Sequence, residues 1–171
     1  MTPIPLVQTI ISTPLGDMRL AASDTGLAGA WFTTAQRHAP APERWVVWPT
    51  APEHPVLHAA HTQLNAYFRR ERPSFDLPLD LSSGTPFQQA VWRALLGIKP
   101  GTTRSYGDMA QQIQRPNAVR AVGSAIGRNP LSIVVPCHRV VGARGDLTGY
   151  AGGLDRKAAL LRLESGAALS F

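Results

Sequence analysis

The sequence predicts an α/β protein of two domains, a small mixed domain at residues 1–85 and a mainly helical domain at residues 86–171. Short apolar runs of strand type fill residues 7–33, whereas apolar residues at helical spacing dominate after residue 86. The charge changes at the same point. Residues 1–85 hold 6 Lys and Arg against 7 Asp and Glu, a net charge of −1, and residues 86–171 hold 11 against 4, a net charge of +7. A basic half beside a neutral half favours binding of a polyanion such as nucleic acid, although ordinary solubilising arginine gives the same balance.

The first half contains strand patterns followed by one helix. Three apolar runs between residues 7 and 33, separated by turns at 14–17 and near Gly26, predict a small antiparallel sheet. Residues 39–55 are rich in proline and alanine and predict a loop with one short strand. Apolar residues at helical spacing from Leu57 to Phe68 predict a helix of about four turns.

The second half starts with a capped helix. Thr85 is a suitable N-cap and Pro86 a suitable first residue, and the expected buried residues are Phe87, Val91 and Leu95. Two short helices at 105–113 and about 117–126, separated by Arg115-Pro116, outline a helix-turn-helix. A plain helical hairpin would give the same pattern. The expected core stripe of the second of these helices is Val119, Val122 and Ile126.

The chain ends with a strand, a loop and a helix. Ile133-Val134-Val135 predicts a short buried strand that leads into Cys137. Residues 142–153 predict a glycine-rich loop. A final helix that reaches Glu164 is indicated by Leu154, Ala158 and Leu161.

The composition excludes several classes of protein. Cys137 is the single cysteine, which rules out an intrachain disulfide and a cysteine-rich zinc site. No apolar run approaches the roughly 18 residues that a bilayer span needs. The first five residues lack a basic region and include two prolines, so we expect no secretory signal, no membrane partner and a cytoplasmic location.

Three histidines in the first half have spacing that suits metal ligands. His54, His58 and His61 would share one face of a helix. No carboxylate or cysteine joins them, and surface histidines explain the pattern as well. We expect no metal ion.

The sequence around Cys137 points to chemistry. A lone cysteine after an apolar strand is commonly an inert core thiol. Here His138 and Arg139 follow it directly, and nearby positive charge lowers the pKa of a thiol and makes the thiolate available.

Pro136-Cys137-His138-Arg139-Val140 resembles the active-site signature of the O6-alkylguanine-DNA alkyltransferases. The resemblance runs from about Phe87 to Glu164, with each block in the family's order and spacing, and the first 85 residues resemble the family only in length and strand pattern. The other blocks are Ser105-Tyr106, residues 117–123, Asn129-Pro130, residues 149–153 and the final Leu-Arg-Leu-Glu. The resemblance implies a ribonuclease-H-like first domain and a second domain with a winged-helix-like helix-turn-helix.

The resemblance also implies roles for five catalytic residues. Cys137 would be the nucleophile, His138 would take its proton through a water, and Glu164 would hold the imidazole. Tyr106 would donate its phenol proton to the departing guanine, and Asn129 would tie the helix-turn-helix to the cysteine loop. A last-turn carboxylate, a half-buried aromatic residue and a turn-forming Asn are the structural alternatives for Glu164, Tyr106 and Asn129.

The same family pattern implies a substrate pocket. Tyr150 and the loop through Gly152 and Gly153 would form its wall. The Ala151 N–H and the Val140 carbonyl would read the guanine edge.

The helix at 117–126 has small side chains, which suits a minor groove that is read almost without regard to sequence. Its expected DNA-facing residues are Ala118, Ala121, Gly123 and Ser124. Arg120 would fill the stack in place of the flipped nucleotide, or contact a phosphate.

The resemblance therefore implies repair of O6-alkylguanine, and more weakly of O4-alkylthymine, by irreversible single-turnover transfer to Cys137. No cofactor is implied. The expected partner is double-stranded DNA that contains alkylated guanine, bound by a monomer, with cooperative binding left open. The rivals are an alkyltransferase-like binding protein, whose known examples lack the cysteine, and a thiol hydrolase built on Cys137, His138 and Glu164.

Overall fold

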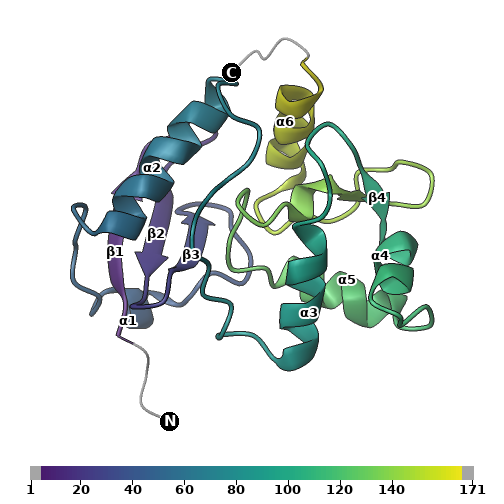
Figure 1. The fold of residues 1–171 in the computed structure, drawn as a ribbon, viewed down its shortest axis with the longest axis horizontal. Coiled ribbons are helices and arrows are strands. Elements are labelled where there is room, and N and C mark those ends of the chain that lie inside the picture. Colours follow the sequence, from purple (N-terminus) through teal and green to yellow (C-terminus); the bar gives the residue numbers. More distant parts are fainter. Residues whose placement is uncertain (1–4, 167–171) are drawn as a thin grey trace.

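The computed structural model describes residues 5–166, in which a small sheet and one long helix form the first half (Figure 1). The predicted antiparallel sheet is confirmed, with strand order β1-β2-β3. Its strands are β1 (Val7–Ile11), β2 (Met18–Ala22) and β3 (Leu27–Phe32). The register pairs Ile11 with Met18 and Met18 with Phe32, so large apolar side chains meet on the buried face.

The helix after the sheet is also confirmed. It is α2 (Pro55–Phe68), and its buried residues are Leu57, Ala60, Leu64 and Tyr67. Between the sheet and α2, the prediction of a loop with one strand was wrong. The structure has a short helix, α1 (Pro42–Trp45), and only an isolated bridge between Gln8 and Thr50. The Gln8 side chain donates to the carbonyl oxygens of Trp45 and Trp48, both at 2.9 Å, and this holds the segment against β1.

The second half begins with the capped helix that the sequence predicts. Thr85 accepts from the Gln88 N–H, and the Gln88 side chain accepts from the Thr85 N–H, so both form a capping box. The helix is α3 (Pro86–Leu95), followed by β4 (Arg104–Ser105), α4 (Tyr106–Gln112) and α5 (Val119–Gly127). The helix pair α4 and α5 agrees with the predicted pair of short helices.

The buried face of α5 starts one turn later than expected. Val119 is 40% exposed, whereas Val122, Ala125 and Ile126 are buried. The N–H of the Trp92 indole on α3 donates to the Ala125 carbonyl at 2.8 Å, so this end of α5 packs on α3. Val119 lies at the N-terminal end of α5, away from that contact.

The strand predicted at Ile133-Val134-Val135 is wrong. These residues form a buried turn in which the Val135 N–H donates to the Leu131 carbonyl at 2.9 Å. Ile133 has a φ of 73°, in the left-handed region that breaks a strand and that β-branched residues rarely adopt. Burial explains the apolar run, because all three side chains lie in the core.

The last helix, α6 (Leu154–Ser165), reaches Glu164 as predicted but buries a different face. The expected apolar face had Leu154, Ala158 and Leu161, whereas the buried residues are Lys157, Leu160 and Leu163. A lysine in the stripe hid this face from apolar periodicity. Before α6 lie the short 3₁₀ helix η1 (Cys137–Arg139) and β5 (Val140–Val141), which pairs in parallel with β4.

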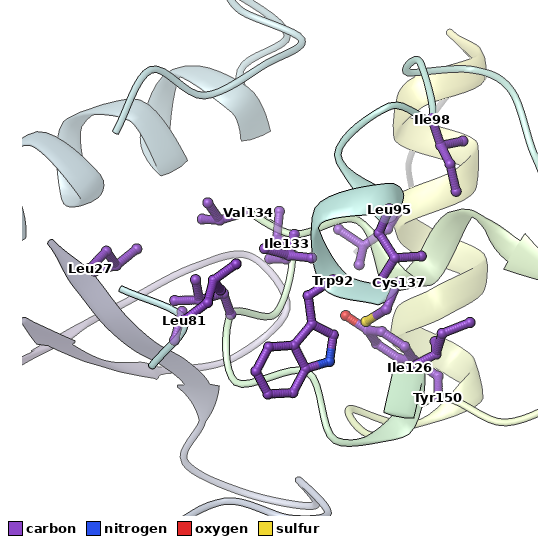
Figure 2. Packing of buried hydrophobic residues seen from close by; sticks show 14 of the residues in the cluster. Leu27, Leu81, Trp92, Leu95, Ile98, Ile126, Ile133, Val134, Cys137 and Tyr150 are labelled. Carbon is purple, nitrogen blue, oxygen red and sulfur yellow. The ribbon is translucent and has the colours of Figure 1, made fainter. Parts of the chain in front are cut away.

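The two halves share one hydrophobic core (Figure 2). Leu27 and Leu81 of the first half lie in the same cluster as Trp92, Ile133 and Cys137. The edge of β3 also binds the second half, because the Ala30 N–H donates to the Pro130 carbonyl at 2.8 Å and the Ser132 N–H donates to the Ala30 carbonyl at 3.0 Å. The first half thus fixes the segment that leads to Cys137. Among residues 5–166, no helix has the length and apolar character to cross a bilayer.

Candidate active site

Cys137 begins η1 and is 5% exposed. Its Sγ accepts a hydrogen bond from Asn129 Nδ2 at 3.1 Å. The same amide donates to the Val135 carbonyl at 2.8 Å and accepts from the Leu131 N–H at 2.9 Å. Asn129 therefore ties together the end of α5, the buried turn and the thiol.

The electrostatic surroundings of the thiol differ from the expectation. Burial raises the pKa of Cys137, although the Asn129 hydrogen bond and the charge of Lys157 oppose this shift. The prediction that positive charge on His138 and Arg139 lowers this pKa is wrong, and His138 opposes the upward shift through a backbone hydrogen bond instead. The Arg139 guanidinium turns away, donating to the Ile98 carbonyl at 2.6 Å and to Glu164, and His138 is uncharged because burial lowers its pKa. Cys137 therefore rests as a neutral thiol.

His138 and Glu164 form a buried pair. His138 Nε2 lies 2.7 Å from Glu164 Oε1, and the two side chains are 0% and 2% exposed. Because a carboxylate only accepts, Nε2 carries the hydrogen and Nδ1 keeps its lone pair. Among residues 5–166, Nδ1 of His138 is buried without a hydrogen-bond partner. His138 is thus a neutral base with a free acceptor atom.

Glu164 accepts hydrogen bonds from two other side chains besides that of His138. Arg139 donates from Nε to Oε2 at 2.9 Å and from Nη2 to Oε1 at 2.7 Å, and Tyr67 Oη donates to Oε1 at 2.8 Å. Burial alone raises the pKa of Glu164, but the hydrogen bonds from His138 and Arg139 outweigh it and hold the pKa well below its usual range. The carboxylate stays ionised, as an orienting group for an imidazole must.

A pocket of about 120 Å³ opens beside the sulfur. Figure 2 shows Cys137 near Ile126 and Tyr150, two residues that line this pocket. The lining residues come from α4, α5, η1, the glycine-rich loop and one loop of the first half: Arg37, His38, Tyr106, Gly123, Ile126, Gly127, Cys137, Gly149, Tyr150 and Ala151.

Two tyrosines form the aromatic walls. Tyr106 is half-buried, burial raises its pKa, and its hydroxyl donates to the Thr148 carbonyl at 2.9 Å. Tyr150 is buried, and burial raises its pKa well above the ordinary value. A Cβ at Gly152 would lie 2.8 Å from the Tyr150 ring and 3.2 Å from the Phe32 ring, so only glycine leaves this ring its place.

Of the two residues expected to read the substrate through backbone groups, Ala151 lies in the glycine-rich loop at the pocket, whereas Val140 is buried in β5 and is not one of the lining residues. The Val140 carbonyl accepts from Lys157 Nζ at 2.5 Å, which leaves one lone pair of this oxygen. Ala151 lines the pocket, and its carbonyl accepts from the Arg37 N–H at 2.8 Å. Lys157 also donates to the carbonyls of Thr148 and Gly149, both at 3.1 Å, and thereby shapes the loop.

The predicted DNA-facing residues lie on one side of α5. Arg120, Ala121 and Ser124 are exposed, and Ala118 and Gly123 are partly exposed. Gly123 also lines the pocket, where a Cβ would lie 3.6 Å from the Tyr106 ring. This helix therefore connects an outer surface of small side chains to the cavity beside Cys137.

The structure adds contacts that the sequence did not indicate. Tyr67 and Arg139 bind Glu164, Lys157 binds the pocket loop, and Arg37 and His38 line the pocket. For Lys157, the signal in the sequence was its helical spacing from Leu160, which places a lysine on the apolar face of the last helix. By contrast, His58 and His61 are exposed on α2. Residues 5–166 contain no cluster of three or more His, Cys, Asp or Glu side chains that could hold a metal ion.

Both parts of the chain match models of one protein family. Residues 86–166 match the model described as "6-O-methylguanine DNA methyltransferase, DNA binding domain", and residues 6–81 match "6-O-methylguanine DNA methyltransferase, ribonuclease-like domain".

Individual relatives agree with the family models. A methylated-DNA–protein-cysteine methyltransferase from Mycobacterium tuberculosis is 49% identical over 154 residues, which cover 90% of this chain and 89% of the relative. One from Methanosarcina acetivorans is 46% identical over 155 residues, covering 91% and 96%. Among solved structures, the crystal structure of M. tuberculosis OGT in complex with DNA has a TM-score of 0.85 and 48% identity, with 93% of each chain covered.

Proposed function

Because the chain belongs to the 6-O-methylguanine DNA methyltransferase family, we propose that it repairs DNA by moving an alkyl group from guanine O6 to its own Cys137. Alkyl groups on thymine O4 are weaker substrates. The observation that carries the proposal is a buried thiol that lines a pocket beside α5 and is followed directly by an uncharged histidine paired with an ionised Glu164.

The chemical step begins with the thiol proton. It passes through a bridging water to Nδ1 of His138, while Glu164 stabilises the resulting imidazolium through Nε2–H. The sulfur then attacks the alkyl carbon in line with the bond to O6. The carbon–oxygen bond breaks as the carbon–sulfur bond forms, and its electron pair leaves with the guanine. The thioether that forms on Cys137 is stable and does not regenerate the thiol, so each molecule reacts once.

The departing base needs a proton and a fixed position. Tyr106 lines the pocket, and its raised pKa keeps the phenol protonated. When the base is bound, the hydroxyl stops donating to the Thr148 carbonyl and donates to a guanine ring nitrogen instead. The remaining lone pair of the Val140 carbonyl and the Ala151 N–H bind the guanine edge. Tyr150 and Gly152 form the wall against which the base packs.

The DNA partner is a double helix bound at its minor groove by α5. Ala118, Ala121, Gly123 and Ser124 leave this helix narrow enough for the groove, and groove contacts of this kind carry little sequence information. Arg120 is the long exposed side chain on that face, and it fills the stack when the damaged nucleotide leaves the helix.

The two parts of the chain have different roles in this function. A ribonuclease-H-like domain ends near residue 85, and a domain with a winged-helix-like helix-turn-helix carries both α5 and Cys137. The charge of +7 in residues 86–171 suits a DNA-binding part. The protein acts as a monomer in the cytoplasm, whether or not neighbouring molecules cooperate on DNA.

Mass spectrometry of the intact protein tests the proposal. After mixing with a duplex that contains O6-methylguanine, wild-type protein gains one permanent methyl group per molecule, on Cys137. Cys137→Ala gains none and keeps its affinity for the duplex within about a few-fold, because α5 and not the sulfur makes the DNA contacts. An unchanged wild-type mass with intact DNA binding would favour a non-reacting damage binder, and turnover of an ester substrate would favour a thiol hydrolase.

A further inference from the structure

Tyr67 joins the first half of the chain to the carboxylate of the candidate active site. It lies in the last turn of α2, and its hydroxyl donates to Glu164 Oε1 at 2.8 Å across 97 residues of sequence. The side chain is buried, with 2% of the residue exposed. The steps described above for Cys137 and His138 make no use of this hydroxyl.

The position of the Tyr67 ring is fixed on two sides. The Phe68 ring meets it edge-on at 5.4 Å between centroids, and the Phe75 ring lies against it at the same distance. Burial and the neighbouring Glu164 raise the pKa of Tyr67, so the phenol keeps its proton. Tyr67 is therefore a permanent hydrogen-bond donor that cannot leave Glu164 without repacking the end of α2.

The acceptor atom is the same oxygen that binds the histidine. Glu164 Oε1 receives hydrogen bonds from Tyr67, from Arg139 Nη2 at 2.7 Å and from His138 Nε2 at 2.7 Å. Donors that share one oxygen compete for its charge. A phenol on Oε1 therefore reduces the negative charge that this oxygen offers to the imidazole, and a less negative neighbour makes the imidazolium less stable.

We infer that Tyr67 is a positioning residue for the proposed alkyl transfer, holding the Glu164 carboxylate in place and keeping His138 a weaker base. The inference rests on the proposed function, since it concerns the same proton transfer. It gives the first half a part in the chemistry of a site whose reacting atoms all come from the second half.

Other charged and titratable groups around this pair are the background that a test must hold constant. Arg139 comes from η1 and Lys157 from α6, and both act on His138. Tyr150, from the pocket wall, interacts electrostatically with Tyr67 and Glu164. Arg70 and Arg72, which follow α2, line the cleft beside Glu164. None of these groups is altered when only the Tyr67 hydroxyl is removed.

The experiment compares Tyr67→Phe with wild-type protein in single-turnover transfer from an O6-methylguanine duplex between pH 5 and 8.5. The variant keeps the ring and loses the hydroxyl. We expect the first-order rate at its plateau to fall about 2- to 10-fold, the range for loss of one hydrogen bond. We also expect the acid limb of the profile to move up by about 0.5 to 1 pH unit, because His138 becomes more basic.

Leu57→Ala is the matched control for loosened packing. Leu57 is fully buried in α2, roughly 15 Å along the helix from Tyr67. This variant lowers the melting temperature without moving the acid limb. As a second measurement, 3,5-difluorotyrosine at position 67 makes the phenol a stronger donor, and the acid limb then moves to lower pH.

The outcomes separate two failures. A wild-type protein that transfers no methyl group overturns the proposed function itself. An active wild type with an unmoved acid limb in Tyr67→Phe and in the fluorinated protein overturns the role of Tyr67 alone. The same holds if Leu57→Ala moves the limb as far as Tyr67→Phe does, since the effect then belongs to packing.

Discussion

At the residue scale, burial of the one thiol determines how its reactivity must arise. Burial raises the pKa of Cys137, and the Asn129 amide is its hydrogen-bond donor at 3.1 Å. The resting thiol is therefore a poor nucleophile, which protects it against oxidants and stray electrophiles. In the proposed mechanism, reactivity appears only when a substrate fills the pocket and His138 Nδ1 receives the proton.

Tyr106→Phe tests whether the phenol takes part in the proposed transfer. The variant keeps the ring against Gly123 and loses the hydroxyl that now donates to the Thr148 carbonyl. Full general-acid catalysis is worth about 10²–10⁴-fold. We expect a loss near the bottom of that range in the first-order transfer step, with affinity for undamaged DNA little changed, because the same bond also holds the flipped base. Single-turnover kinetics at saturating protein measure it, and a wild-type rate would leave Tyr106 a packing residue.

At the scale of elements, α5 has two unlike faces. Val122 and Ile126 are buried against the core, and Trp92 fixes the helix through the Ala125 carbonyl. The opposite face has Arg120 as its long side chain among alanine, glycine and serine. A firmly held helix with a thin outer face is suited to entering a narrow groove.

Arg120→Ala tests the role of that face. Filling the gap in the base stack offsets an extrusion cost of a few kcal/mol, and a free base has no such cost. We therefore expect the variant to repair an alkylated duplex far more slowly while it reacts with free O6-methylguanine at nearly the wild-type rate. Both rates come from the same methyl-transfer assay. Equal losses on the two substrates would assign Arg120 to the pocket or the fold.

Local signals in the sequence predicted the elements well, and they failed where tertiary contacts decide. Thr85 and Pro86 carry the information for the start of α3 within one turn, and the structure has that cap. The run Ile133-Val134-Val135 looks like a strand because it is buried, yet contacts from Asn129 and Leu131 fold it into a turn. The buried face of α6 was missed because Lys157 finds three carbonyl partners there.

At the scale of the whole molecule, local motifs predicted part of the candidate site, and tertiary contacts decided the rest. The motif around Cys137 and the final Glu164 were visible because they resemble a family pattern in order and spacing. The contacts of Tyr67 with Glu164 and of Arg37 with Ala151 were not, because they join segments far apart in the sequence. No periodicity or motif specifies such pairs, which exist only once the two halves are packed.

The buried ionisable pair makes the stability of the whole molecule sensitive to acid. Burial lowers the pKa of His138, and its hydrogen bonds hold the pKa of Glu164 well below the usual range. The unfolded chain therefore binds more protons below about pH 6.5 for the histidine and below about pH 4.3 for the glutamate. Each group that binds one more proton in the unfolded state costs up to about 1.4 kcal/mol of stability per pH unit.

We therefore expect the free energy of unfolding to fall steadily as the pH drops below about 6.5. Urea denaturation at several pH values between 4.5 and 8 measures it. His138→Gln is the control, and it should lose the part of the decline that lies between about pH 6.5 and 5. A wild-type stability that stays flat over that interval would show that His138 is not held neutral in the folded protein.

The shared core and the exposed connection between the two halves determine how the protein would respond to cleavage of the chain. The connection at Ser82 and Ser83 is exposed, whereas Leu81 before it and Trp92 after it lie in one shared core, and Arg156 on α6 donates to the Leu15 and Thr34 carbonyls at 3.0 and 2.8 Å. The covalent link thus acts mainly as a tether that keeps the two partners at a high effective concentration. A chain cleaved at this turn would behave as a bimolecular complex whose alkyl acceptor is assembled at high protein concentration and lost on dilution.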